Sequence, residues 1–170
     1  TLEAGLDVKS MSETSTKVFI LEVMGRHAGW IAAASALAST NETDPPHIIL
    51  MPEVPFAKKK FIDKVKETVA SEGFCVVVAS EGTRYKNGMF LADSGLKDAF
   101  GHKQLGGVAP VLAQMISSIG LKNHWAVSDY LQRSARHISS KTDLDQAYAV
   151  GKKAVEFALA GKNAVMPVIK

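Results

Sequence analysis

The chain has 170 residues, of which 46% are hydrophobic and 22% charged, and its formal net charge is +3. This composition is typical of a globular domain with a sizeable core, and it excludes a disordered or fibrous chain. Lysine and arginine are spread along the sequence rather than gathered into blocks, which argues against a nucleic-acid partner.

The number of cysteines, the length of the apolar runs and the start of the chain limit the class of protein further. The single cysteine, Cys75, excludes an internal disulfide and a cysteine-rich zinc site. No apolar run approaches the ~20 residues that a membrane helix needs, and residues 1–15 lack the apolar core of a signal peptide. We therefore expect a cytoplasmic protein without a membrane partner. Because residue 1 is threonine and the start is polar, we expect a fragment. Residues 1–16 would connect it to a missing N-terminal domain, and residues 17–170 would form one α/β domain.

In the first half of the chain, apolar runs alternate with helical patterns. Short β-rich apolar runs predict strands buried on both faces, and Ala-rich or amphipathic stretches predict helices. The predicted elements are a strand at 17–24, a helix at 26–39, a strand at 47–51, a helix at 57–71 and a strand at 74–79. In the second helix Phe61, Val65 and Val69 share one face, while four lysines lie mainly on the solvated side.

The second half continues the alternation after a glycine-rich connection at 82–107. It predicts a helix around 111–119, a strand at 124–127, a helix from 142 to 160 and a last strand at 164–169. Thr142 and Asp145 have the spacing of a capping box for the long helix. The whole pattern predicts a three-layer α/β fold, a mostly parallel sheet with helices on both faces like half of a Rossmann fold.

Polar residues follow three of the predicted strands. In an open parallel sheet ligands bind beyond the carboxyl ends of the strands. The first strand is followed by Met24, Gly25 and Arg26, where glycine allows close approach of a ligand and arginine offers a charged fork suited to a phosphoryl group. The alternative is that Gly25 and Gly29 only allow close packing of helix on strand, and periodicity does not choose between the two.

Glu81 follows the third strand and could accept hydrogen bonds from sugar hydroxyls, or it could simply cap nearby amides. Tyr130, Gln132 and Arg133 follow the fourth strand, where Arg133 and Arg136 could hold an anion or remain solvated. Three polar strand ends at one sheet edge together favour a ligand site there.

Other common chemistries lack support in the sequence. The five histidines form no His-x-x-x-His or His-Glu-x-x-His pattern, so no metal ligands are assigned. No Gly-x-Ser-x-Gly nucleophile elbow is present, which leaves acyl transfer without support.

Three segments together resemble the phosphofructokinase family: EVMGR at 22–26, the SEG that follows an apolar strand, and the YLQR loop before a long helix ending in AGK. The resemblance runs from about residue 14 to residue 161. EVMGRHAGW and DYLQRSARH make the sequence most similar to the bacterial pyrophosphate-dependent members. The motif EVMGR is specific to the family, whereas SEG alone is not.

The resemblance implies a set of substrate-binding residues for fructose 6-phosphate. Met24, Gly25 and Arg26 would bind the sugar phosphate, and Arg26 would also neutralise charge on the transferring phosphoryl group. Glu81 would hold the sugar. The family loop His-x-Gln-Arg corresponds here to Tyr130, Leu131, Gln132 and Arg133, with tyrosine in place of histidine. Lys17 stands nine positions before Arg26, where the family often has a basic residue that reaches the 6-phosphate in a neighbouring subunit.

A second stretch, residues 101–107, also resembles the family's His-x-Gln-Arg-Gly-Gly form, but Leu105 stands where arginine is needed. It is followed by a helix and another strand before the terminal helix, whereas YLQR leads directly into that helix. We therefore assign the loop to YLQR.

The resemblance also implies what these residues lack. The family's Gly- and Asp-rich donor loop and its Thr-Ile-Asp-Asn-Asp stretch, with the catalytic base and magnesium-holding aspartate, do not occur. We expect the sugar-phosphate half of a reversible glycolytic phosphotransferase that uses pyrophosphate and Mg²⁺ and forms homodimers or homotetramers. An ATP-dependent phosphofructokinase and a non-catalytic phosphosugar-binding or oligomerisation module remain alternatives.

Overall fold

The computed structural model describes residues 1–97, 103–105 and 107–170, and the side chains of 94–106 are not described. The chain divides into two compact units, Thr1–Gln132 and Arg133–Lys170. The boundary predicted at residue 16 remains a prediction, although helix α1 (Leu2–Met11) lies in the first unit and its Val8 packs against Phe74 and Val76. No helix in the described part of the chain is long and apolar enough to span a membrane.

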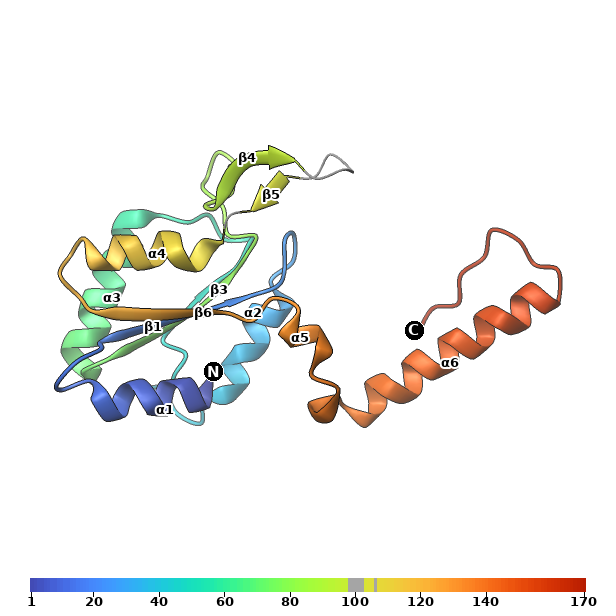
Figure 1. Ribbon diagram of the computed structural model, residues 1–170, viewed down its shortest axis with the longest axis horizontal. Coiled ribbons are helices and arrows are strands. Elements are labelled where there is room, and N and C mark those ends of the chain that lie inside the picture. The colour runs from blue at the N-terminus through green and yellow to red at the C-terminus, as the bar shows by residue number, and fades with distance from the viewer. Residues whose placement is uncertain (98–102, 106) are drawn as a thin grey trace. The chain divides into compact units, whose positions relative to one another are not determined.

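A four-stranded parallel sheet forms the centre of the first unit, with the strand order β2-β3-β1-β6 (Figure 1). Its strands are β1 (Val18–Val23), β2 (Ile48–Leu50), β3 (Cys75–Ser80) and β6 (Asn123–Val127). All four were predicted to within about two residues. All six residues of β3 are buried and those of β1 are buried or half-buried, as in a central parallel strand covered by helices, whereas β2 is half-buried and β6 is largely exposed.

Helices cover both faces of the sheet (Figure 1). On one face, α3 (Lys58–Glu72) and α4 (Val108–Ser117) enclose the main core with the alternate residues Val18 and Ile20 of β1. On the other face lie α1 and α2 (Trp30–Ala34), against Val76 and Val78 of β3. The predicted three-layer α/β fold is confirmed.

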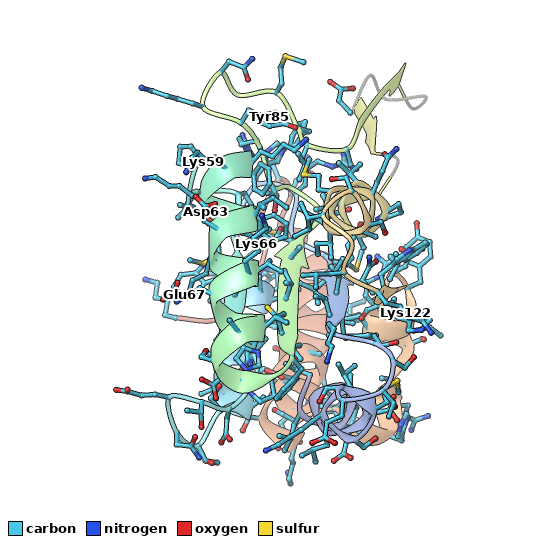
Figure 2. The ribbon with its side chains drawn as sticks, turned by 90° about the vertical axis from the view of Figure 1, so that its left-hand side faces the viewer. Lys59, Asp63, Lys66, Glu67, Tyr85 and Lys122 are labelled. Atoms are coloured by element: carbon cyan, nitrogen blue, oxygen red, sulfur yellow. The ribbon has the colours of Figure 1, made fainter. Side chains whose placement is uncertain are left out.

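Helix α3 has the predicted amphipathic character. Phe61 and Val65 are buried, and Gly73 ends the helix in the left-handed conformation with a φ of +83°. Figure 2 shows Lys59, Asp63, Lys66 and Glu67 along the outer face of the helix. Lys59 pairs there with Asp63 at 2.7 Å. The lysine cluster is therefore a solvated face.

In the first unit the start of one predicted helix is wrong, and one pair of strands was not predicted. The helix predicted from residue 26 begins at Trp30 and continues as a 3-10 turn, η1 (Ser35–Ala38), because residues 25–29 form a turn instead. The connection predicted at 82–107 contains an antiparallel pair, β4 (Asp93–Lys97) and β5 (Lys103–Leu105). Residues 101, 102 and 106 of the second family-like stretch lie outside the described residues.

The second unit contains helix α6 (Lys141–Leu159), preceded by the 3-10 turn η2 (Arg136–Ile138). Helix α5 (Leu131–Ser134) spans the junction of the two units. Ser140, rather than Thr142, caps α6, because its hydroxyl accepts a hydrogen bond from the Asp143 amide at 3.1 Å. The strand predicted at 164–169 is wrong, since those residues form no strand.

Candidate functional site

Sheet register brings three of the predicted strand ends level with one another. Val23 of β1 pairs with Ser80 of β3, and Glu22 pairs with Val127 of β6. The next residues, Met24 and Glu81, therefore leave the sheet side by side, with Ser128 and Asp129 following on the other side of β1. The carboxyl edge of the sheet is the place where parallel α/β folds bind ligands.

Hydrogen bonds tie these strand ends together. The Gly25 amide donates to Oε1 of Glu81 at 3.2 Å, and the Met24 amide donates to Oε1 of Gln132 at 3.2 Å. The Ser80 hydroxyl donates to the Gly25 carbonyl, and it accepts a hydrogen bond from the Gly82 amide at 3.3 Å. The turn after β1 is thus held by side chains from the turns after β3 and β6.

Glycine is required at two positions of this junction. Gly25 has a φ of +138°, and a Cβ there would lie 2.6 Å from the Ala28 carbonyl oxygen. At Gly82 a Cβ would lie 2.0 Å from the Arg26 carbonyl oxygen and 2.6 Å from that of Gly25. The two turns are therefore packed backbone against backbone.

Gly29 allows close packing of the chain, which was the alternative role considered for the glycines of this motif. It is buried, and a Cβ there would lie 2.9 Å from the Met51 side chain and 2.8 Å from Oε2 of Glu53. Its amide donates to Oε1 of Glu53 at 2.8 Å. This hydrogen bond fixes the turn at the point where α2 begins.

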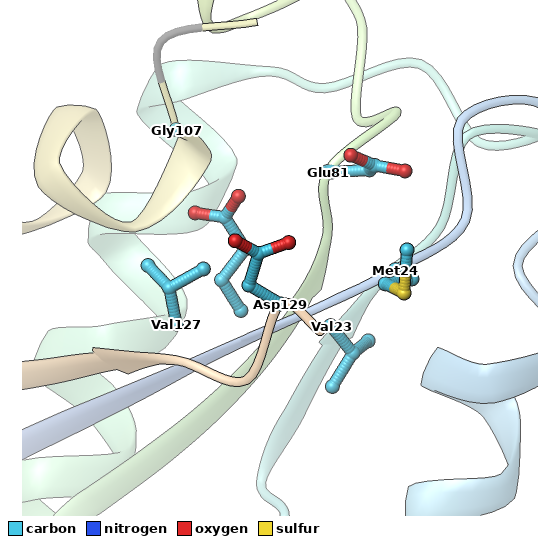
Figure 3. A pocket seen from close by; sticks show the side chains of 7 residues that line it. Val23, Met24, Glu81, Gly107, Val127 and Asp129 are labelled. Carbon is cyan, nitrogen blue, oxygen red and sulfur yellow. The ribbon is translucent and has the colours of Figure 1, made fainter. Parts of the chain in front are cut away.

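A cavity of about 260 Å³ opens at the same edge of the sheet. It is lined by Glu22, Val23, Met24, Glu81, Gly107, Val127 and Asp129. In Figure 3, Glu81 and Met24 lie on one side of the cavity, and Val127 and Gly107 lie on the other. The three carboxylates among these residues are hydrogen-bond acceptors, which suit hydroxyl groups better than phosphate oxygens.

Glu22 is the buried member of this group, with 5% of its surface exposed. Its Oε2 accepts a hydrogen bond from the Ala109 amide at 2.7 Å, at the N-terminus of α4. Burial raises the pKa of Glu22, the amides of Ala109 and Val108 lower it, and the carboxylates of Glu81 and Asp129 raise it further. The balance is a raised pKa.

Asp129 has a left-handed backbone with a φ of +39°, which aspartate tolerates better than most residues. Sequence reasoning missed Glu22, Gly82 and Asp129. The signal for Glu22 was a single charged residue inside an apolar strand, and the signal for Asp129 was its place two residues after the end of β6.

Arg26 lies in the turn that follows Gly25, and its side chain is partly exposed. In the described part of the chain no hydrogen bond or ion pair engages the Arg26 guanidinium. Arg26 does not line the cavity, but it follows Gly25, whose amide is bonded to Glu81, and a permanently charged fork there can bind an external anion.

The other predicted site residues are not all brought together. Gln132 reaches the Met24 amide, whereas Tyr130 and Leu131 are 62% and 74% exposed and do not line the cavity. Arg133 belongs to the second unit, whereas the cavity belongs to the first. Lys17 precedes the opposite end of β1, about 20 Å away along the strand, where its ammonium donates to the Ser12 carbonyl.

No group of three or more histidine, cysteine, aspartate or glutamate side chains within the described ranges is placed to hold a metal ion. The chemistry that this edge offers is recognition: carboxylates for hydroxyl groups, an arginine for an anion, and backbone turns fixed by hydrogen bonds.

Comparison with known proteins identifies the family. The phosphofructokinase family profile matches residues 2–158. A protein of Halomonas elongata named pyrophosphate–fructose 6-phosphate 1-phosphotransferase is 66% identical over the whole chain, and one of the same name from Methylococcus capsulatus is 58% identical over 98% of it. The crystal structure of a pyrophosphate-dependent phosphofructokinase from Marinobacter aquaeolei covers the whole chain with a TM-score of 0.81 and 59% identity.

The chain spans 41% and 40% of the lengths of the two curated relatives and 39% of the crystallised chain. The family profile covers most of the sequence, including the three strand ends that hydrogen bonds bring together. The chain therefore belongs to the phosphofructokinase family.

Proposed function

We propose that this chain is the sugar-phosphate-binding part of a longer pyrophosphate-dependent 6-phosphofructokinase. The complete enzyme would move a phosphoryl group from pyrophosphate to the 1-hydroxyl of fructose 6-phosphate, reversibly, as a step of glycolysis in the cytoplasm. The observation that carries the proposal is the hydrogen-bonded junction of three family motifs, in which Arg26 is free to bind an anion. The names of the relatives at 58% and 66% identity support pyrophosphate as the donor.

The geometry supports a division of roles at the sheet edge. Carboxylates in the cavity, Glu81 foremost, would accept hydrogen bonds from sugar hydroxyls. Met24 and Gly25 would supply the backbone wall on which the sugar rests, and Gln132 would hold that wall through the Met24 amide. Arg26 would contact the phosphoryl group, because a phosphate placed among three carboxylates would be repelled.

Phosphoryl transfer depends mainly on positioning and charge neutralisation. In the proposed reaction the oxygen of the 1-hydroxyl bonds to a phosphorus of pyrophosphate, the bridging P–O bond breaks, and inorganic phosphate leaves. Arg26 would stabilise the charge spread over the transferring oxygens. The base that takes the hydroxyl proton, and the ligands of Mg²⁺, would come from outside this chain. Mg²⁺ would neutralise phosphate charge when bound.

Residues outside the cavity also belong to the proposal. Tyr130 and Arg133, with Leu131 between them, would bind sugar or phosphate oxygens in the family loop. Lys17, at the opposite end of β1, would serve the site of a neighbouring subunit, which requires a homodimer or homotetramer. Lysine supplies charge there without a bidentate fork.

The donor and the activity are tested with the complete gene product. Formation of fructose 1,6-bisphosphate is measured with equal concentrations of pyrophosphate or ATP, each with Mg²⁺. Turnover with pyrophosphate at least 100-fold faster than with ATP is the expected result. Turnover with ATP alone would overturn the donor assignment. Binding of fructose 6-phosphate without turnover on either donor would instead identify a non-catalytic phosphosugar module. The isolated 170-residue chain is expected to show negligible turnover.

A further inference from the structure

Arg84 lies in the turn after β3, yet its side chain reaches back to the turn that carries Arg26. Its Nη2 donates to the Arg26 carbonyl at 3.0 Å, and its Nε donates to the Gly82 carbonyl at 3.4 Å. Nη2 also lies 3.3 Å from Nδ1 of His27. Because arginine only donates, Nδ1 of His27 accepts, and the proton of a neutral ring lies on Nε2. One guanidinium thus contacts Gly82 in its own turn and Arg26 and His27 in the turn after β1.

The other side of this guanidinium is held by an aromatic ring. Cζ of Arg84 lies 4.8 Å from the centroid of the Phe90 ring, within the range of a cation–π contact, and the His27 ring lies 6.1 Å from that ring. Phe90 is kept in place because its strand partner is Arg84 itself, and the Leu91 amide donates to the Thr83 carbonyl at 2.8 Å. Arg84 is therefore fixed on both sides.

No carboxylate pairs with Arg84 in the part of the chain that the structure describes. Its charge is matched with two backbone carbonyls, the face of the Phe90 ring and a ring nitrogen of His27 rather than with an acid. The bond to the Arg26 carbonyl fixes the peptide plane next to the Cα of Arg26, and therefore the direction in which its Cα–Cβ bond leaves the turn. This arrangement orients a second arginine without neutralising it.

We propose that Arg84 is a positioning residue, which sets the direction in which Arg26 meets the phosphoryl group. The inference rests on the proposed function and deepens it. The planar fork is the feature required, because Arg84 uses two different nitrogens, Nε and Nη2, for its two carbonyls while its plane stacks on a ring, whereas the donors of a lysine ammonium all lie on one nitrogen without a planar face. A positioning role predicts that the effect of losing Arg84 depends on Arg26 being present.

The test is a double-mutant cycle in the complete gene product, with the pyrophosphate-dependent phosphorylation of fructose 6-phosphate as the readout. Arg84→Gln and Arg84→Lys are each made with and without Arg26→Ala. Lys86→Gln is the matched control, since Lys86 is exposed on the same hairpin, is not placed in the site, and loses the same charge. Urea unfolding midpoints of all variants show whether each one is folded.

We expect both Arg84 variants to lower kcat/KM for fructose 6-phosphate at least tenfold with Arg26 present, and less than twofold in Arg26→Ala. Lys86→Gln should change kcat/KM less than twofold. Full activity in Arg84→Lys, or the same factor in both backgrounds, would overturn the positioning role. So would a loss matched by Lys86→Gln, which would indicate net charge instead. A wild-type protein without this turnover would refute the proposed function, a separate result.

Discussion

The substitution Gly82→Ala adds one methyl group, and we expect that methyl group to disrupt the candidate site. A Cβ at residue 82 would lie 2.0 Å from the Arg26 carbonyl oxygen and 2.5 Å from the Arg26 carbonyl carbon, whereas real Cβ contacts are essentially never under 3.0 Å. The turn would have to move by at least 1.0 Å, the difference between 3.0 and 2.0 Å. Because the obstacle is backbone, no rotamer change relieves it. We expect a loss of about 3 kcal/mol in the free energy of unfolding.

The same displacement should reduce activity, because a shift of ~1 Å in a positioned group costs about 100-fold in rate. The measurements are urea unfolding, followed by circular dichroism, and kcat/KM for fructose 6-phosphate in the complete gene product. Gly151→Ala is the matched control, since it adds the same methyl group within α6 where nothing lies within 4 Å. It should be neutral or stabilise by up to about 1 kcal/mol. An unchanged midpoint together with an unchanged kcat/KM in Gly82→Ala would show that the two turns do not need a glycine at residue 82.

Three other predictions concern buried groups in the first unit. Because the folded pKa of Glu22 is raised, the folded state binds the Glu22 proton more tightly, so stability falls as pH rises from about 4.5 through the folded pKa. Glu22→Gln should reduce this fall, and unfolding curves at pH 4.5 and 7.5 check it; an equal fall in the variant would contradict it. Burial raises the pKa of Cys75 to about 12, so iodoacetamide at pH 8 should alkylate it only after urea denaturation, and rapid native alkylation would be the contrary result. Val65→Ala should cost about 2 kcal/mol in the free energy of unfolding, because Val65 is fully buried against the sheet; a loss below about 0.5 kcal/mol would show that the site repacks freely.

The strands and the layer order could be predicted from sequence because burial on both faces leaves a clear apolar run. β3 is the clearest case, since all six of its residues are buried. Met24 and Glu81 leave the sheet at the same edge, as expected, because parallel strands bring their carboxyl ends together. The sequence pattern did not predict the register of the strands. In the structure Val23 pairs with Ser80, and this pairing places Met24 next to Glu81.

The contacts that build the site could not be predicted, because they join segments far apart in the chain. The clash that requires Gly82 is with the backbone of Arg26, 56 residues earlier, and glycine is common in turns that make no such contact. Glu22 interrupts an apolar run, but its partner is the amide of Ala109, 87 residues later. Local patterns carry no information about such pairs.

Other misses have local causes. The helix predicted from residue 26 begins four residues later because the positive φ of Gly25 and the hydrogen bond from Gly29 to Glu53 keep the intervening residues in a turn. The run at 164–169 is apolar enough for a strand, but an apolar run becomes a strand only where a neighbouring strand satisfies its amides and carbonyls. Residues 164–169 pair with no strand among the described residues.

We propose above that the carboxyl edge of the sheet binds a sugar phosphate through Arg26. The most direct measurement is calorimetric titration of fructose 6-phosphate into the complete gene product and into its Arg26→Ala variant, with both shown to be folded and with Lys86→Gln as the charge control. We expect binding that weakens at least tenfold in Arg26→Ala and less than twofold in Lys86→Gln. Equal affinity in wild type and Arg26→Ala, or no binding by a folded wild-type protein, would contradict it.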